Sequence, residues 1–382
     1  MGRLGLLYFT YYFALGSNTA FLASWLTGRG LAPGEIALAG ALALVARTLG
    51  QPLIGYAGDH YGRRAVLILC SAAAAAAMVA LALSSGTAAI YPLIFAAGLF
   101  LGPVLPLTDA LALADKHVNY GRARLWGSIG FASANLIGGY LIDRLGVAQV
   151  IWIDVAGLSV LALVTRALPR AATVPGPSTR RAELLAFLKL PLAWLFILSI
   201  AAMNAAHAYY YLFSVKHWHE HLGLSYATTG WLWFAGVAAE TVLLFALGNR
   251  ATRKWAIGLM LVGGLGAMVR FSITAFDPPL AILFAAQALH ALSYGAMHLG
   301  AMQVLRVAVP PRISTAAMGV YAAIVNGVVF GLVTLSLGSV YEAWAGRGFL
   351  LSAAFGLVGA LGILAFARLW QGGAFARERR PG

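Results

Sequence analysis

The sequence predicts an all-α membrane protein with twelve transmembrane helices in two six-helix halves. Composition supports the class: of 382 residues, 61% are hydrophobic and only 10% are charged, whereas a soluble domain has about 25% charged residues. The apolar runs are long, about 20 residues each, which is the length that crosses a bilayer core. A single long polar connection in the middle of the chain divides six runs from six.

The twelve expected spans follow one another with short loops. They cover residues 4–26, 34–57, 65–85, 88–113, 123–142, 147–167, 191–214, 225–248, 255–275, 279–304, 314–340 and 348–370. We therefore expect an N-terminal six-helix half (1–167), a cytoplasmic central loop (168–190), a C-terminal six-helix half (191–370) and a basic cytoplasmic tail (371–382). The central loop is marked by Pro169, Pro175, Gly176 and Pro177.

The net charge of +14 does not indicate nucleic acid, because the basic residues are distributed as in a membrane protein. With the N-terminus in the cytoplasm, twenty Lys or Arg lie on the cytoplasmic side, four lie opposite and two lie within spans. That asymmetry follows the positive-inside rule. We expect a protein of a bacterial-type inner (plasma) membrane, embedded in the lipid bilayer as a functional monomer, with both termini cytoplasmic and no nucleic-acid partner.

The two halves show sparse internal matches. An offset of 193 aligns Gly30 with Gly223, Arg47 with Glu240 and Gly55 with Gly248, and an offset of 199 aligns Gly139 with Gly338 and Asp143 with Glu342. Internal repeats are typical of secondary transporters, in which the substrate site lies between the halves.

The loop between spans 2 and 3 carries the strongest motif. It reads Gly55-Tyr-Ala-Gly-Asp59-His-Tyr-Gly62-Arg63-Arg64, and it resembles the signature loop of the major facilitator superfamily, in which a basic residue is usual where His60 stands. The resemblance implies the major facilitator fold and a gating role for Gly55, Asp59, Gly62, Arg63 and Arg64. The alternative is a basic turn that only sets topology.

Several further segments are similar to the 3-phenylpropionate transporter family, near the lactose permease and nucleoside symporter branch. They are Pro106–Leu111, Tyr120–Phe131, Ala206–Ser214, Gly236–Glu240, Val269–Arg270 and Leu289–His290. The resemblance extends over both halves and implies proton symport of an aromatic carboxylate.

Charged side chains inside the spans are costly and therefore indicate function. Five stand out: Arg47, Asp109, Glu240 and Arg270 within spans, and Arg124 at the cytoplasmic start of its span. Asp154 lies nearer the outer end of its span, where we expect it to be solvated.

For proton coupling, Glu240 is the first candidate and Asp109 the second. Burial and a nearby arginine have opposing effects on the proton affinity of a carboxylate, so a change of partner could switch it. Glu240 and Arg270 lie on consecutive spans, in positions where the lactose permease also has an acid and an arginine. His290 falls in the span where that permease has its coupling histidine. A permanent structural ion pair is the alternative.

For substrate binding, Arg47 or Arg270 could hold a carboxylate, because guanidinium is a planar, permanently charged fork. Only one need do so, and the other would be neutralised by an acid. Asp109 and Arg124 flank one hairpin and could form a cavity-lining pair. His207, Tyr210 and Trp233 complete the candidates, although helix packing or an interfacial aromatic belt would also explain such residues.

Other classes of site are not expected. The segment Lys216–His221 has three histidines, but we interpret it as a solvated outer loop and expect no metal and no cofactor. The sequence lacks a nucleophile elbow, a His-Glu-x-x-His motif and a phosphate-binding loop, so we do not expect an enzyme or a nucleotide-driven pump.

The expected function is alternating-access symport of protons with a small-molecule substrate, a small organic anion such as an aromatic carboxylate. The alternatives are a proton-driven exporter, a symporter of a neutral solute such as a sugar or nucleoside, and a non-transporting membrane receptor.

Overall fold

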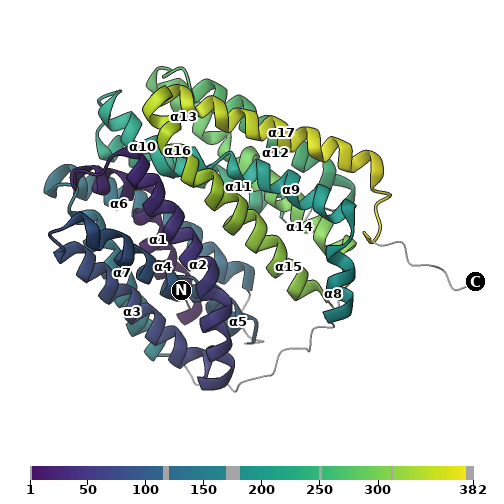
Figure 1. Cartoon of the computed structure of the whole chain (residues 1–382), viewed down its shortest axis with the longest axis horizontal. Helices are drawn as coiled ribbons and strands as arrows, with labels where there is room; N and C mark the ends of the chain where they lie inside the picture. Colours follow the sequence, from purple (N-terminus) through teal and green to yellow (C-terminus); the bar gives the residue numbers. More distant parts are fainter. Residues whose placement is uncertain (1, 115–119, 169–180, 249–251, 311–312, 376–382) are drawn as a thin grey trace, which may run out of the picture. The chain divides into compact units, whose positions relative to one another are not determined.

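The computed structural model describes residues 2–114, 120–168, 181–248, 252–310 and 313–375, which are helical nearly throughout and contain no strand (Figure 1). The first part contains α1 (Arg3–Gly28), α2 (Pro33–Tyr61), α3 (Arg63–Leu83), η1 (Thr87–Ala89), α4 (Ile90–Leu101), α5 (Val104–Ala114), α6 (Tyr120–Leu145) and α7 (Gln149–Arg166). The rest contains α8 (Arg181–Leu188), α9 (Pro191–Ala205), α10 (Ala208–Glu220), α11 (Tyr226–Leu247), α12 (Arg253–Thr274), α13 (Leu280–Ala288), η2 (Ala291–Ala296), α14 (Met297–Ala308), α15 (Ser314–Ala322), η4 (Ala323–Val329), α16 (Phe330–Trp344), η5 (Ala345–Gly348) and α17 (Phe349–Leu369).

The predicted fold class is confirmed. Ten stretches of the described residues are long and apolar enough to cross a membrane. One of them, Ala316–Leu369, has 54 residues and contains two crossings, since a helix rises 1.5 Å per residue. The 26-residue α1 is not among the ten because its tyrosines, Thr10 and Asn18 lower its hydropathy. Dividing the long stretch and adding α1 accounts for the twelve predicted spans.

Two predicted loops contain helix. The polar segment Lys216–His221 is not a loop: α10 continues to Glu220, and both Lys216 and His217 are buried. Lys216 pairs with Glu220 one turn later, at 2.6 Å, so this ion pair forms within the helix. In the predicted central loop, residues 169–180 lie outside the described residues, but Arg181–Leu188 forms α8.

Four helices are interrupted inside the predicted spans. Gly102 and Pro103 separate α4 from α5, and His207 follows the end of α9. The π-helical segments η2 and η4 interrupt two further spans. Irregular backbone at membrane depth is tolerated where it is buried in protein, and π segments are frequent at functional sites. These interruptions therefore direct attention to His207 and to the side chains of η2 and η4.

The chain forms two compact units. Unit 1 comprises residues 1–175, 211–237 and 334–345, and unit 2 comprises 176–210, 238–333 and 346–382. Within unit 1, α1 packs on α6 and α7, while α4 packs on α2 and α3. Within unit 2, α12 packs on α14 and α17, and α17 also packs on α9. The division into two six-helix halves at 168–190 remains a prediction.

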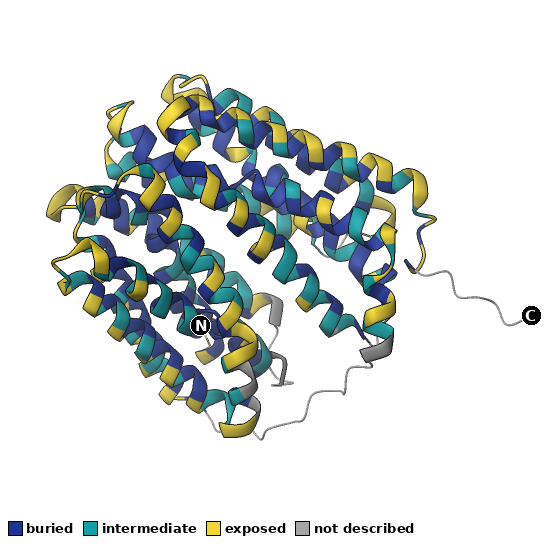
Figure 2. Cartoon of the chain, viewed as in Figure 1, coloured by how far each residue is buried: buried dark blue, intermediate teal, exposed yellow. Residues whose placement is uncertain are grey.

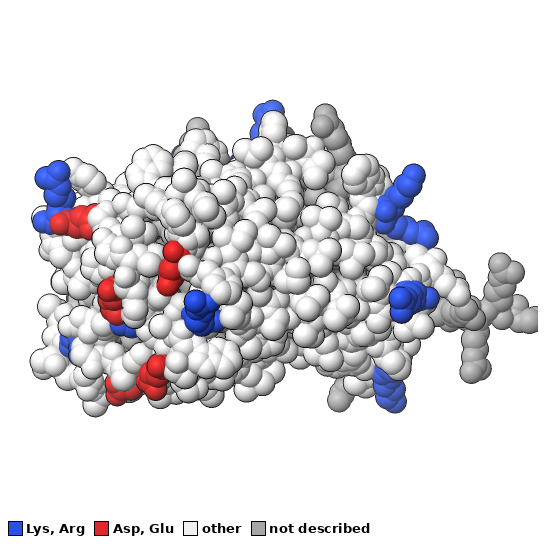
Figure 3. Space-filling model, turned by 90° about the horizontal axis from the view of Figure 1, so that it is seen from above, with Lys and Arg blue, Asp and Glu red and all other residues white. Residues whose placement is uncertain are grey.

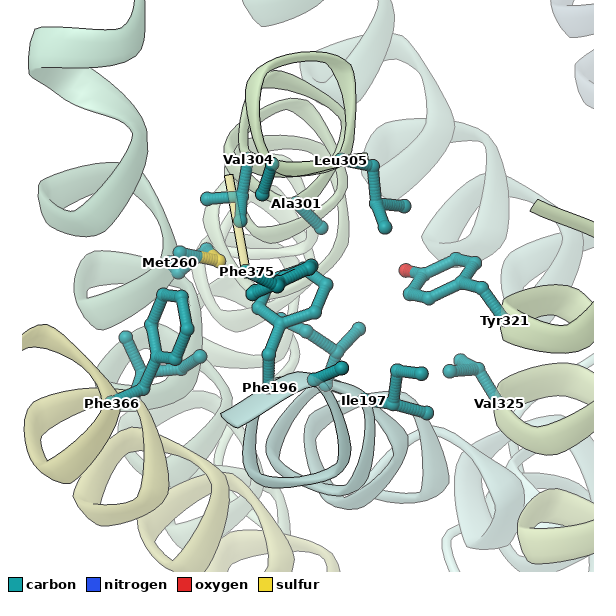
Figure 4. Close-up of a cluster of buried hydrophobic side chains, with 14 of the residues drawn as sticks. Phe196, Ile197, Met260, Ala301, Val304, Leu305, Tyr321, Val325, Phe366 and Phe375 are labelled. Atoms are coloured by element: carbon teal, nitrogen blue, oxygen red, sulfur yellow. The ribbon is translucent and has the colours of Figure 1, made fainter. Parts of the chain in front are cut away.

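Unit 2 has a large apolar core (Figure 4). Phe196 of α9 lies at its centre, 5.4 Å from the ring of Phe366 and 5.8 Å from that of Phe375. Tyr321 lies on the other side of Phe196, at 6.3 Å. Phe375 lies beyond α17 and its backbone N–H bonds to Ala308 O at 3.0 Å, so the chain returns to this core after its last helix.

The helices carry buried and exposed faces side by side (Figure 2). Many exposed side chains are apolar, among them Leu53, Val242 and Phe245. On the face shown in Figure 3, most of the surface belongs to residues other than Lys, Arg, Asp and Glu. Such a surface suits contact with lipid rather than water.

Unit 1 also supports the internal repeat. Asp143 accepts hydrogen bonds from the backbone N–H of Tyr226 and Ala227, at 2.9 and 2.8 Å, at the N-terminus of α11. Glu342 accepts one from Gly34 N–H, at 3.3 Å, at the N-terminus of α2. A carboxylate at a helix N-terminus is stabilised by the helix dipole. The two acids are offset by 199 residues, and Gly34 and Ala227 by 193, so the sequence repeat corresponds to equivalent contacts.

We expect Gly50→Ala to lower stability strongly. A Cβ at Gly50 of α2 would overlap the backbone carbonyl of Leu99 in α4, which cannot move as a side-chain tip can. Overpacking of this kind costs about 1–3 kcal/mol or more. The control is Gly258→Ala, because a Cβ there meets no atom within 4 Å. Thermal unfolding of the purified variants in detergent makes the comparison, and equal melting temperatures would contradict the described packing of α2 on α4.

Candidate functional site

Arg270 of α12 is the centre of a polar network in unit 2. Its side chain is fully buried, with 0% exposure. Its guanidinium donates from Nη2 to Gln287 Oε1 at 2.7 Å, and from Nη1 to His290 Nδ1 at 2.8 Å and Ser293 Oγ at 3.3 Å. The guanidinium carbon also lies 4.4 Å from the centre of the Tyr210 ring, a cation–π distance. Thus the structure brings together three predicted residues, Arg270, His290 and Tyr210.

The donor at Arg270 determines how the imidazole of His290 is protonated. Guanidinium only donates hydrogen bonds, so His290 Nδ1 must be an acceptor and the neutral ring carries its proton on Nε2. His290 Nε2 lies 3.3 Å from Glu240 Oε2 of α11. Arg270 thus donates to His290, and the opposite edge of the imidazole, which carries Nε2–H, lies next to the Glu240 carboxylate.

Glu240 is the outermost of these three groups. Its side chain retains 18% exposure, against 8% for His290. A second proton on His290 would have to displace the hydrogen bond from Arg270, whereas a proton on Glu240 would not. Of the predicted proton-coupling residues in unit 2, Glu240 is therefore the better placed to take up and release a proton.

A second branch of the network leads to His207, at the start of α10. His207 Nδ1 lies 3.3 Å from the carbonyl oxygen of Met203, so Nδ1 carries the proton and Nε2 accepts. The hydroxyl of Ser293, at 3.1 Å, then donates to His207 Nε2 while accepting from Arg270. Ser293 belongs to the π segment η2, which turns its hydroxyl between the two basic groups.

Ser293 and Gln287 are not among the site residues predicted from the sequence. Both are fully buried, and both hold Arg270. The available signal was their spacing around His290, three residues on either side within one apolar span.

We expect Ser293→Ala to destabilise the protein by about 1–3 kcal/mol, because buried groups on both sides lose a partner. Ser339→Ala, which alters an exposed hydroxyl that bonds only within its own helix turn, is the control and should change stability by less than about 0.5 kcal/mol. Thermal melts of both variants test this; a Ser293 variant as stable as the Ser339 variant would exclude a bridging role.

Unit 1 contains the predicted Asp109–Arg124 pair. Arg124 Nη1 lies 3.2 Å from both carboxylate oxygens of Asp109. Tyr8 of α1 donates to Asp109 at 2.6 Å, and Arg124 Nη2 donates to Tyr12 at 3.5 Å. The side chains remain accessible, with 41% exposure for Arg124 and 24% for Asp109. Arg124 is thus a half-exposed guanidinium oriented by an acid, whereas Arg270 is fully enclosed.

The prediction that Asp154 is solvated is wrong. Its exposure is 1%, because α7 is oriented so that Asp154 points into the interior of unit 1. There Asn18 of α1 donates to Asp154 Oδ2 at 2.8 Å. Arg47 of α2 lines the same small cavity as Asp154. The structure therefore places predicted residue Arg47 beside an acid of its own unit.

The remaining predicted residues lie apart from these networks. Trp233 of α11 is buried in unit 1, donates to Ser214 at 3.2 Å, and lies 5.7 Å from the Tyr211 ring and 6.2 Å from the Phe131 ring. The rings of Trp233, Tyr211 and Phe131 form an aromatic cluster within unit 1.

In the predicted gating loop, Gly62 has φ of +90°, which favours glycine, and it links α2 directly to α3. Arg63 donates to the carbonyl oxygen of Ala110 at 3.4 Å, and Arg64 donates to that of Arg166. Gly55 lies within α2, and the side chain of Asp59 lies outside the described residues. The arginines thus fasten the α2–α3 turn to α5 and α7, while its gating role remains a prediction.

Among the described residues, no group of three or more His, Cys, Asp or Glu is arranged to hold a metal. The networks around Arg270 and Arg124 consist of charged, hydrogen-bonding and aromatic side chains. Such groups can bind an anion and exchange protons without a bound cofactor.

Comparison with known proteins identifies the family of this chain. The family model described as the MFS_1 like family matches residues 1–351. The "Probable 3-phenylpropionic acid transporter" of Escherichia coli K12 is 31% identical, covering 89% of this chain and 90% of that protein. The maltose permease of Geobacillus stearothermophilus is 30% identical, covering 99% and 95% of the two chains.

Solved structures show the same fold. The crystal structure of nucleoside transporter NupG superimposes with a TM-score of 0.82, at 18% identity, over 96% of this chain and 98% of that one. That of a D-xylose-proton symporter gives 0.70 at 15% identity, over 97% and 95%. The chain therefore belongs to the MFS_1 like family of the major facilitator superfamily; it is an integral membrane protein and a secondary transporter rather than an enzyme.

Proposed function

We propose that the protein is a proton-coupled symporter of a small organic anion, such as an aromatic carboxylate, and that it works by alternating access. The observation that carries the proposal is the series of contacts from Arg270 to His290, at 2.8 Å, and from His290 to Glu240, at 3.3 Å. It joins a permanent cation to an ionisable acid through a neutral imidazole, inside a segment where an unpaired charge would be costly.

In this proposal, Glu240 is the proton carrier. Its carboxylate lies 3.3 Å from His290 Nε2, on the side of the ring that carries the N–H. Lengthening this contact during the transport cycle would remove a donor and favour the protonated form. Asp109 is the second proton site, and in unit 1 it forms a direct ion pair with Arg124, at 3.2 Å.

We assign anion binding first to Arg124. Its guanidinium is half exposed and is oriented by Tyr12 and Asp109. Protonation of Asp109 would weaken its hold on Arg124, which could then receive a carboxylate in a bidentate pair. Arg270 is enclosed by three neutral acceptors, and we assign it to coupling. His207, Tyr210 and Trp233 then serve to shape the site.

The substrate class is supported by the relative whose name specifies 3-phenylpropionic acid. The maltose permease and the nucleoside transporter with the same fold favour a second candidate, symport of a neutral solute. For both candidates we expect a functional monomer in a bacterial inner membrane. The distribution of Lys and Arg favours cytoplasmic termini.

Uptake by purified protein in liposomes tests the proposal. Labelled 3-phenylpropionate, maltose and uridine are offered separately, with and without an imposed pH gradient. Protein-free liposomes correct for the membrane permeability of the neutral acid. We expect gradient-dependent accumulation of 3-phenylpropionate that Arg124→Gln abolishes. Accumulation of maltose or uridine in its place would support the second candidate, and no gradient-dependent uptake across a panel of carboxylates would overturn the anion symporter.

A further inference from the structure

A small cavity in unit 1 is lined by residues from five helices, including Asn18, Arg47, Met78, Leu101, Asp154 and Leu158. Its water-accessible volume is about 10 Å³, close to the minimum that holds one water molecule. Most of the lining is apolar. The charged groups are Arg47 of α2 and Asp154 of α7, and Asn18 of α1 supplies an amide.

Two buried polar atoms of these residues lack a hydrogen-bond partner within the described part of the chain: Asp154 Oδ1 and Arg47 Nε. The other carboxylate oxygen, Asp154 Oδ2, is held by Asn18 at 2.8 Å, so the carboxylate cannot rotate without losing that bond. Arg47 and Asp154 form no direct ion pair within 4.0 Å in the described structure. Asp154 Oδ1 is an acceptor, Arg47 Nε carries a donor hydrogen, and both residues border the same cavity.

We propose that this cavity is a binding site for one water molecule that bridges Arg47 and Asp154 into a buried ion pair. The water accepts from Arg47 Nε–H and donates to Asp154 Oδ1, which satisfies both atoms. Asn18 is the positioning residue, because it fixes the carboxylate with Oδ1 available to the water. The charge of Arg47 is then neutralised inside unit 1.

The pairing matters because each charge alone would be costly. A carboxylate with 1% exposure loses nearly all of its hydration, and only a nearby cation and hydrogen-bond donors offset that loss. Removing one member of a buried pair leaves the other uncompensated, whereas removing both can be nearly neutral. This asymmetry provides a test that does not depend on substrate or on the proposed symport.

The experiment compares thermal unfolding of five purified variants in detergent: Arg47→Gln, Arg47→Lys, Asp154→Asn, the double variant Arg47→Gln/Asp154→Asn, and the control Arg144→Gln. Arg144 lies in the exposed last turn of α6 in the same unit. We expect Arg47→Gln and Asp154→Asn each to lower the melting temperature by several degrees. The melting temperature of the double variant should be closer to that of the wild type than the melting temperature of either single variant. Arg47→Lys should melt at a higher temperature than Arg47→Gln, and the control should melt at the wild-type temperature.

Losses that add in the double variant would show that the two charges do not interact and would overturn the proposal. If Asp154→Asn does not fold, the comparison of Arg47→Lys with Arg47→Gln still decides, because equal losses would show that the charge of Arg47 is irrelevant. Infrared spectra give an independent readout of Asp154. A protonated-carboxyl band that is present in the wild type and absent from Asp154→Asn would establish a neutral acid and would also overturn the ion pair.

Discussion

Replacing Glu240 with Gln is expected to abolish the pH-gradient-driven accumulation of substrate while leaving substrate exchange across the membrane intact. Glutamine matches the size of glutamate and can place its amide oxygen next to His290 Nε2, so the 3.3 Å contact and the local packing are kept. It cannot bind and release a proton. Exchange requires the loaded carrier to reorient but needs no net proton movement, and it should therefore persist.

The matched control for this variant is Glu220→Gln. Glu220 also pairs with a base, Lys216 at 2.6 Å, but it is at the end of α10 and its side chain has 35% exposure. Lys216 is buried, but Glu220 itself is accessible to water and lies outside the Arg270–His290–Glu240 network. Its replacement should therefore leave accumulation, measured per amount of folded protein, near the wild-type level. Uptake with and without the gradient, followed by counterflow, separates coupling from transport. Full accumulation in Glu240→Gln would remove Glu240 from the coupling role.

Arg270→Met should have the largest effect on stability. The substitution leaves a side chain of similar length but removes the donors to Gln287, His290 and Ser293. It also leaves Glu240 without the nearby permanent cation. Breaking a buried charged network in this way costs about 3–5 kcal/mol. Arg270→Lys should recover only part of that loss, because an ammonium group cannot reproduce the planar fork that reaches three acceptors.

Arg253→Met, on the same helix, is the control. Arg253 is exposed and its guanidinium lies over the Trp370 ring at 6.0 Å, so its loss should shift stability by less than about 1 kcal/mol. Melting curves and the fraction of monodisperse protein in detergent compare the two variants. Similar melting temperatures for Arg270→Met and Arg253→Met would contradict the described network.

Much of the fold was predictable because the bilayer imposes one dominant rule. Every span needs about 20 apolar residues, so span number follows from hydropathy without knowledge of packing. The repeat was also readable: Asp143 and Glu342 matched in the sequence and make equivalent contacts in the structure. Lys216–His221 was misassigned because its polar side chains suggested a loop, while the Lys216–Glu220 pair and burial within unit 1 stabilise a helix.

The candidate site was only partly predictable. Intramembrane charge identified Arg270, Glu240 and Asp109, because the cost of burial makes such residues rare. Which groups hold them depends on the rotation of each helix and on local irregularities that hydropathy does not encode. The π segment that positions Ser293 is such an irregularity. The rotation of α7 about its axis, which buries Asp154, is the other case.

The central claim is that substrate transport is coupled to proton transport by the Arg270–His290–Glu240 network. The most direct test records the internal pH of proteoliposomes with a trapped dye when 3-phenylpropionate is added outside, after subtraction of the signal from protein-free liposomes. We expect the wild type to acidify the interior and Glu240→Gln to give no protein-dependent signal. Equal acidification by the two proteins, or a protein-dependent alkalinisation in the wild type, would contradict this account.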